Sequence, residues 1–125
     1  MKKKITYKIL FCLSVISAFF SSYLFAAQPI SIENQTNYVY TNKGNTTIDA
    51  NNYGIYFRIG ANNTIRNTET GVLNITAQDD GIEFNDATDS NFTNEGNTTI
   101  DANQNGIAFY LGANNTIRNT ETGVL

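Results

Sequence analysis

Two blocks of this chain recur letter for letter at one fixed offset. Residues 44–51 (GNTTIDAN) return as residues 96–103, and residues 60–73 (GANNTIRNTETGVL) return as residues 112–125. The shift from Gly44 to Gly96 equals the shift from Gly60 to Gly112. A fixed period of this kind is typical of repeat proteins, in which each unit packs against its neighbours along the chain. The chain is therefore interpreted as a stack of units.

The stretch from one identical block to its copy contains a shorter repeating unit. Its pattern is an apolar residue, an Asn two positions later, a Gly, an Ile-x-Ala triplet and a Gly-Ile-x-Phe ending. The copies begin at Tyr40, Ile65, Phe92 and Ile117, at nearly equal intervals. The pattern predicts three complete units, with the fourth incomplete at Leu125.

Apolar residues alternate with mostly polar ones inside each unit, as in Ile48 and Ala50, or Ile55 and Phe57. A period of two with β-branched and aromatic residues predicts short strands with one buried face. Gly, Asn and Asp between these runs supply the turns. Three such strands in about 26 residues bury their faces together if the chain coils and the coils stack about 4.8 Å apart. The predicted fold is all-β, a parallel β-helix (solenoid) of about three coils.

Stacking in register predicts rows of equivalent side chains. An Asn row at one bend can hydrogen-bond along the stack through its amides, as Asn ladders do in stacked strands. One inner row of Ile and another of Phe would form the core, and all three rows are interpreted as structural. The rows are Asn42, Asn67, Asn94 and Asn119; Ile48, Ile75 and Ile100; and Phe57, Phe84 and Phe109.

The N-terminal segment 1–27 has the pattern of a secretory signal peptide. Lysines at the start are followed by the apolar run 9–20 and by Ala26-Ala27, and cleavage is expected after Ala26 or Ala27. The alternative is an uncleaved anchor, because the segment 9–27 is just long enough to span a bilayer. The expected organisation is signal peptide 1–27, lead-in 28–37 and β-helix repeats 38–125, with export across the inner membrane.

Composition excludes several classes of function. The net charge is −3, and four of the eight basic residues lie before residue 10, so the remaining chain is strongly acidic. An acidic chain is a poor candidate for binding nucleic acid. There is no His, and the single Cys12 lies within the predicted signal peptide. Without these residues no Ser-His-Asp or Cys-His nucleophile can form, so no catalytic, cofactor-binding or metal-binding residue and no cofactor are predicted.

The second unit is acidic where the others are neutral. A solvated acidic turn is the favoured interpretation. One alternative is a Ca²⁺ site near Asp79 and Asp80, because this cation takes oxygen ligands. Another is a carboxylate pair for cleaving glycosides. The acidic residues concerned are Asp79, Asp80, Glu83, Asp86 and Asp89.

Tyr53, Tyr56 and Tyr110 are predicted to point outward. They would form an aromatic surface for a glycan or a host protein, although isolated exposed aromatic residues are also ordinary. Seven Asn-x-Thr triplets match the glycosylation pattern, and we attribute them to the repeat itself. They begin at Asn34, Asn45, Asn62, Asn74, Asn91, Asn97 and Asn114.

The cadence of the repeat, carried by residues 63–67, Gly71, 75–77 and 81–84, resembles the passenger domains of bacterial autotransporters and related β-helical surface adhesins. The resemblance implies a secreted or surface-displayed, adhesin-like protein at the outer membrane, with a host surface protein or glycan as partner. That the chain is not an enzyme is predicted separately, from its lack of a catalytic set of residues. It implies further repeats and a C-terminal membrane barrel, so this chain would be an N-terminal fragment that does not contact the membrane after signal cleavage. A fragment of a carbohydrate-active β-helix enzyme and a non-functional truncated remnant are the alternatives.

Overall fold

The computed structural model describes residues 28–125, and the predicted signal peptide 1–27 lies outside them. The described part is all-β, with eleven strands and no helix. It accordingly contains no helix that is long and apolar enough to cross a membrane.

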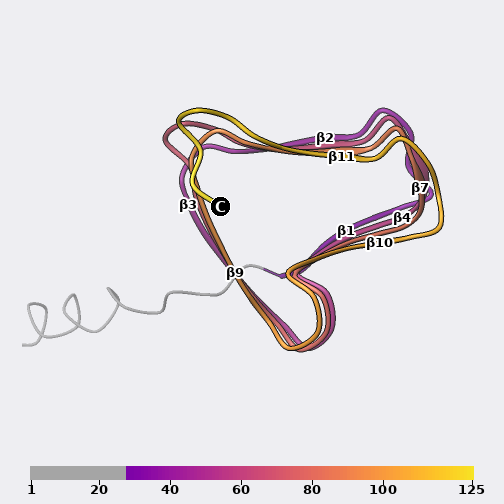
Figure 1. The fold of residues 1–125 in the computed structure, drawn as a ribbon, viewed down its shortest axis with the longest axis horizontal. Helices are drawn as coiled ribbons and strands as arrows, with labels where there is room; N and C mark the ends of the chain where they lie inside the picture. Colours follow the sequence, from indigo (N-terminus) through magenta and orange to yellow (C-terminus); the bar gives the residue numbers. More distant parts are fainter. Residues whose placement is uncertain (1–27) are drawn as a thin grey trace, which may run out of the picture.

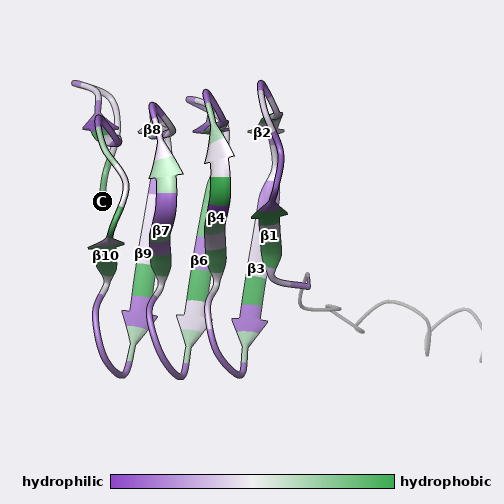
Figure 2. Ribbon diagram, turned by 90° about the vertical axis from the view of Figure 1, so that its right-hand side faces the viewer, coloured by the Kyte–Doolittle hydropathy of each residue, from purple (hydrophilic) through white to green (hydrophobic). Residues whose placement is uncertain are grey.

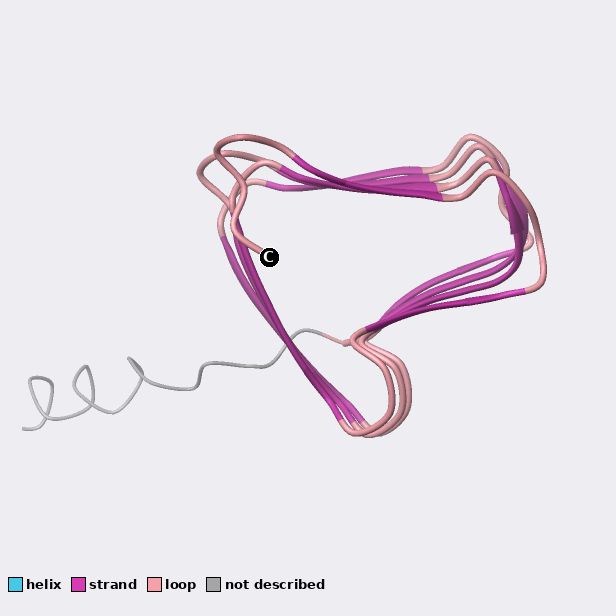
Figure 3. Cartoon of the chain, viewed as in Figure 1, coloured by secondary structure: helices cyan, strands magenta, loops and turns pink. Residues whose placement is uncertain are grey.

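The strands form three parallel sheets, one on each side of a coil (Figures 1 and 3). The first sheet holds β1 (Ile30–Glu33), β4 (Ile55–Ala61), β7 (Ile82–Thr88) and β10 (Ile107–Tyr110). The second holds β2 (Val39–Asn42), β5 (Thr64–Asn67), β8 (Asn91–Asn94) and β11 (Thr116–Asn119). The third holds β3 (Asn45–Ala50), β6 (Val72–Ala77) and β9 (Asn97–Ala102).

Each of the first three turns of the chain takes one strand from each sheet, the last turn takes β10 and β11 from the first two sheets, and the turns stack side by side (Figure 2). We name the turns coil 1 (residues 30–54), coil 2 (55–81), coil 3 (82–106) and coil 4 (107–125). The fold is thus a parallel β-solenoid of about four turns, which confirms the predicted fold class. In the end-on view the loops between the third and first sheets nearly superpose, whereas those between the second and third sheets spread apart (Figure 3).

The register between coils follows the spacing of the repeat. Tyr40 lies opposite Ile65, Ile65 opposite Phe92, and Phe92 opposite Ile117. Because the identical blocks keep the same phase, each apolar position meets its own equivalent in the next coil, and a slip of one residue would turn the core face outward.

The solenoid begins before residue 38. The expected lead-in 28–37 contains β1, in which Ile30 and Ile32 pair with Ile55 and Phe57. The alternation of Ile30, Ser31 and Ile32 repeats the strand pattern, but Pro29 stands where the later coils have Gly, and Ile32 where they have Phe. These two substitutions hide the unit from a pattern based on Gly-Ile-x-Phe.

The predicted rows of Ile and Phe lie in the core, together with further buried residues such as Ile55, Ile65, Leu73, Ile82 and Phe92. The ring of Phe84 stacks on Phe57 with centroids 4.4 Å apart and on Phe109 with centroids 5.0 Å apart. Ile48 and Ile75 are fully buried, and Ile100 packs partly buried against the same cluster. Parallel rings and aligned branched side chains fill the narrow interior of the coil.

The predicted Asn ladder is present at the corner between the second and third sheets. The amide Nδ2 of Asn42 donates to Oδ1 of Asn67 at 2.8 Å, Asn67 to Asn94 at 2.9 Å, and Asn94 to Asn119 at 2.9 Å. The same amide nitrogens reach backbone carbonyl groups at the bend, such as that of Asn97, 3.0 Å from Asn67 Nδ2. The ladder therefore provides hydrogen-bond donors for the backbone carbonyl groups at the bend, and it also links neighbouring coils.

Asn side chains brace a second corner, between the first and second sheets, in a way the sequence analysis missed. Nδ2 of Asn63 donates to the carbonyl of Gln35 at 3.0 Å, and its Oδ1 accepts from the backbone N–H of Tyr38 at 2.9 Å. Asn115, the counterpart of Asn63 in the second identical block, makes the equivalent bonds to Ala87 and Ser90. The exact recurrence of Asn63 at 115 was the available signal.

Candidate interaction surfaces

Two of the three predicted outward tyrosines lie together. Tyr53 is in the turn between β3 and β4, and Tyr56 is on the outer face of β4. Their rings stack with centroids 4.7 Å apart at an angle of 25°, and both side chains are half-buried. Tyr110 is exposed on β10, two coils further on, where its hydroxyl accepts from Asn105 Nδ2 at 3.2 Å. The structure thus gives an aromatic pair and a separate tyrosine.

A hollow of about 330 Å³ adjoins the tyrosine pair. It lies between the turn after β3 and the outer face of β1 and β4. Amide, hydroxyl and carboxylate groups share its walls with the two rings, so it offers hydrogen-bond donors and acceptors beside an aromatic surface. The lining residues that carry these groups are Gln28, Ser31, Asp49, Asn51, Asn52, Tyr53 and Tyr56.

Two carboxylates beside the tyrosine pair are buried, which corrects the expectation of a solvated acidic turn for Asp80 and Glu83. Glu83 lies opposite Tyr56 in the register of β4 and β7, and Asp80 is in the turn just before β7; each is 2% exposed. Asp80 Oδ1 accepts from the backbone N–H of Asn105 at 3.0 Å and from its Nδ2 at 2.7 Å. Glu83 Oε1 accepts from Asn85 Nδ2 at 2.9 Å.

Burial changes the protonation of this cluster. Loss of solvation raises the pKa of Glu83, the hydrogen bond from Asn85 lowers it, and the neighbouring carboxylates of Asp80 and Asp79 raise it further. The pKa of Tyr53 is raised by the charge of Glu83 first, and that of Tyr56 by burial first. All three groups therefore hold their protons more tightly than the same groups do in water.

Asp86 and Asp89, the remaining acidic residues of the predicted acidic unit, lie outside this cluster. Asp86 and Asp89 are exposed at the next corner, where their φ angles are 52° and 51°. Their equivalents in the other coils also have positive φ, a conformation that Asn and Asp tolerate better than most residues. The positions are Asn34, Ile59, Asp86 and Leu111, and Asn37, Asn62, Asp89 and Asn114. The positive φ that the corner requires therefore accounts for Asp at positions 86 and 89.

The described part of the chain shows no cluster of carboxylate side chains that would support the calcium alternative. Residues 28–125 contain no group of three or more His, Cys, Asp or Glu side chains placed to hold a metal ion. Oδ1 of Asp79 accepts from Gln104 Nε2 at 2.8 Å, and Asp80 bonds to Asn105. Both side chains therefore link the end of coil 2 to the end of coil 3.

The glycosylation triplets follow the structure of the repeat. Asn34, Asn62 and Asn114 occupy positive-φ corner positions. The remaining four lie on strands β3, β6, β8 and β9. This placement agrees with the attribution of the triplets to the repeat itself.

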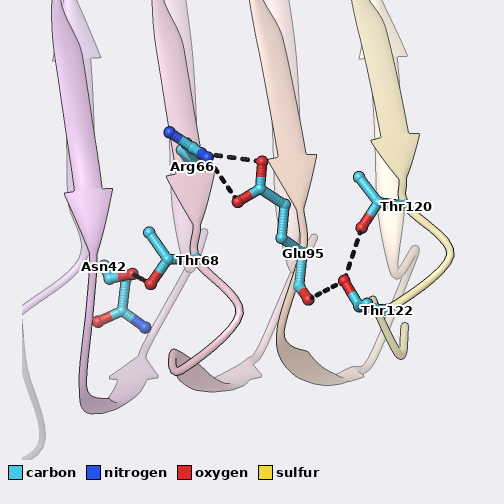
Figure 4. Close-up of polar contacts among 6 residues, drawn as sticks. All are labelled: Asn42, Arg66, Thr68, Glu95, Thr120 and Thr122. Carbon is cyan, nitrogen blue, oxygen red and sulfur yellow. Dashed lines mark hydrogen bonds and ion pairs between the residues drawn. The ribbon is translucent and has the colours of Figure 1, made fainter.

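A second surface lies on the outside of the second sheet and its following corner (Figure 4). Arg66 of coil 2 donates from Nε and Nη2 to the two carboxylate oxygens of Glu95 in coil 3, at 3.0 and 2.7 Å. Hydroxyl groups tie the same corner, as Thr68 donates to the carbonyl of Asn42 at 3.0 Å and Thr122 to that of Glu95 at 3.0 Å. These contacts join consecutive coils from outside.

The last coil repeats the arginine of this surface. Arg118, the counterpart of Arg66 in the second identical block, lines an open hollow of about 430 Å³ together with Glu69, Glu95 and Glu121. Asn119, Thr120 and Thr122 complete its wall. Carboxylate, guanidinium and hydroxyl groups thus gather where coil 4 meets solvent.

No family model, no curated protein and no solved structure matches this chain.

Proposed function

We propose that this chain is part of an exported, surface-displayed and adhesin-like β-solenoid, with a structural and interaction role. Its regular stack of coils supports this role, because a solenoid offers an extended outer surface in place of a single deep pocket. The partner we propose is a neutral glycan, or a glycosylated protein, of a host surface.

The observation that carries this proposal is the stacked pair of Tyr53 and Tyr56 beside the open hollow. A stacked pair is rigid, so binding a ligand against it orders few additional side-chain rotamers. Sugar rings pack their C–H faces on aromatic rings, and their hydroxyls suit amide and carboxylate partners such as Asn51, Asn52 and Asp49. The mixture at this hollow therefore fits a neutral sugar.

Hydrogen bonding of the acids supports an interaction role over catalysis. A carboxylate that acts on a glycoside must reach the bond that is cleaved. Asp80 and Glu83 are almost fully buried and take their hydrogen bonds from Asn105 and Asn85. We therefore propose that they hold coils together and position the tyrosine pair.

The test is glycan binding by the full chain, measured on an array of host glycans and confirmed by isothermal titration. Replacing the tyrosine pair (Tyr53→Ser with Tyr56→Ser) should weaken binding at least about tenfold, because it removes the aromatic surface. Tyr38→Ser is the matched control: Tyr38 is another exposed tyrosine, outside this hollow, and its loss should leave binding unchanged.

Two results would overturn the proposal. Equal binding by the chain with and without the tyrosine pair would show that the hollow is not the binding site. Absence of binding to every glycan on the array would show that the partner is not a glycan of this kind. Release of reducing sugar from a bound polysaccharide, abolished by Glu83→Gln, would replace binding by catalysis.

Export is proposed separately, on the pattern of residues 1–27. N-terminal sequencing of the chain recovered from outside the inner membrane should begin at Ala27 or Gln28. A chain that stays in the cell with its N-terminus intact would contradict export, and an intact N-terminus in the membrane fraction would favour the anchor.

A further inference from the structure

The outer face of coil 4 carries the same side chains as a face that is buried one repeat earlier. Ile55, Phe57 and Ile65 of coil 2 are fully buried under coil 3. Their equivalents Ile107, Phe109 and Ile117 are partly or largely exposed, with Phe109 at 51%. Since the residue types are identical, the difference in burial arises because coil 3 covers the one face, whereas none of the described residues forms a coil over the other.

The hydrogen-bonding groups of coil 4 are also equivalent to those that coil 2 uses to bind coil 3. Asn67 of coil 2 donates its amide to Asn94 in the coil above. Asn119, its equivalent, accepts from Asn94, while its own Nδ2 bonds only locally to the carbonyl of Gly123 at 2.9 Å. The strands β10 and β11 are the last in their sheets, so one edge of each is unpaired within the described residues. Such an edge is a template for a further parallel strand.

The charge of Arg118 indicates which kind of coil fits the outer face of coil 4. Arg66 is met by Glu95 of coil 3 in a two-point ion pair. A coil placed on Arg118 in the same way must therefore offer a carboxylate at the position of Glu95. In coil 1 the position equivalent to Glu95, at the offset of the identical blocks, is occupied by Lys43.

A second copy of this chain is therefore a poor occupant. Stacking its coil 1 on coil 4 would place Lys43 against Arg118, and like charges at such a contact are destabilising. Phe109 would meet Ile32, where Phe57 meets Phe84.

We propose that the outer face of coil 4 is a docking surface for one further coil of the coil 3 type, a single turn of chain that carries a carboxylate opposite Arg118. Lys43 is the residue that prevents coil 1 of a second copy from taking this place. The proposal concerns the end of the stack and does not depend on the tyrosine hollow or its ligand.

The repeat makes a direct experiment possible. Residues 112–125 are identical to 60–73, so a second copy of residues 74–106 appended after Leu125 of the full chain continues the repeat without a break. This extension rebuilds the junction between coils 2 and 3 on top of coil 4. The controls are the same extension with Lys in place of its copied Glu95, and a scrambled extension of equal composition.

Hydrogen–deuterium exchange of the amides in β10 and β11 measures docking. We expect the native extension to slow exchange there by about tenfold or more relative to the unextended chain and the scrambled control. The Lys form should lower the docking equilibrium constant roughly two- to tenfold, because it replaces an exposed ion pair by a repulsion. Arg118→Glu combined with the Lys form should restore it, and high salt should narrow the difference.

Either of two results would overturn the inference. Amides in β10 and β11 that exchange as fast with the native extension as with the scrambled one would show that coil 4 does not accept a coil. Equal protection by the Glu and Lys forms at low salt would show that Arg118 does not select its partner.

Discussion

Asn67 donates its amide to Asn94 Oδ1 at 2.9 Å and accepts from Asn42 at 2.8 Å, so one fully buried side chain links three coils. Asn67→Ala removes this link and leaves the amide of Asn42, the Oδ1 of Asn94 and a bend carbonyl short of partners. We expect a loss of roughly 2–4 kcal/mol in the free energy of unfolding. Urea denaturation measures it, and Asn119→Ala at the exposed end of the ladder should cost clearly less. Similar losses at both positions would contradict a cooperative ladder.

The phenylalanine row predicts a gradient of stability along the stack. Phe84 is fully buried between Phe57 and Phe109, whereas Phe109 is half-exposed. Phe84→Ala should cost about 3–5 kcal/mol, because it removes a buried ring and leaves a cavity. Phe109→Ala should cost less than half as much by the same thermal or urea measurement. An equal cost at both sites would mean that coil 4 is covered in solution.

Glycines at one corner allow close approach of consecutive coils. A Cβ on Gly54 would overlap Ile75 Cγ2 and lie 2.7 Å from the carbonyl oxygen of Gly81, while a Cβ on Gly106 would meet nothing within 4 Å. Gly54→Ala should therefore destabilise the fold by about 1–3 kcal/mol, the usual cost of overpacking. Gly106→Ala is the matched control and should be neutral or slightly stabilising. Reversal of this order in thermal melts would contradict the corner packing.

Ile59 has a conformation that its side chain disfavours. Its φ is 47°, and a β-branched residue in this region is an outlier, whereas two other coils have Asn34 and Asp86 at the equivalent position. Because Ile59 is 45% exposed, Ile59→Asn loses little burial and should raise stability by about 1 kcal/mol. Val39→Asn, at an exposed strand position, should give no such gain. A destabilised Ile59→Asn variant would indicate that this side chain has a contact worth more than the strain.

Glu83 predicts a dependence of stability on pH. Its pKa is raised in the folded chain, chiefly by burial, so the folded state holds this proton more tightly than the unfolded state does. The free energy of unfolding should then fall as pH rises from the ordinary glutamate range through the raised pKa. Glu83→Gln should flatten this slope in urea titrations across that window. Glu121→Gln, at an exposed residue, should leave the slope in place because Glu83 is still present.

The sequence by itself determined the coil and its rows. Identical blocks at one offset fix which residues stack, so the register, the Asn ladder, the phenylalanine row and the three strands per unit follow from local pattern alone. β1 was missed because Pro29 and Ile32 replace the Gly and Phe that mark the other coils. The bracing role of Asn63 and Asn115 was equally available in the repeat and was overlooked.

Only the tertiary structure decided how the acidic and aromatic residues of the outer face are arranged. Glu83 points away from the core like any outward strand residue, and the alternation of its strand predicts exposure. It is buried where Tyr56 of the preceding coil lies opposite it and the turn residues Tyr53 and Asp80 lie close by, with Asp80 held by Asn105. These neighbours lie about one coil away in sequence, and their combined coverage depends on side-chain size and direction. Periodicity specifies which residues share a face, whereas burial on that face depends on which side chains fill the space between coils.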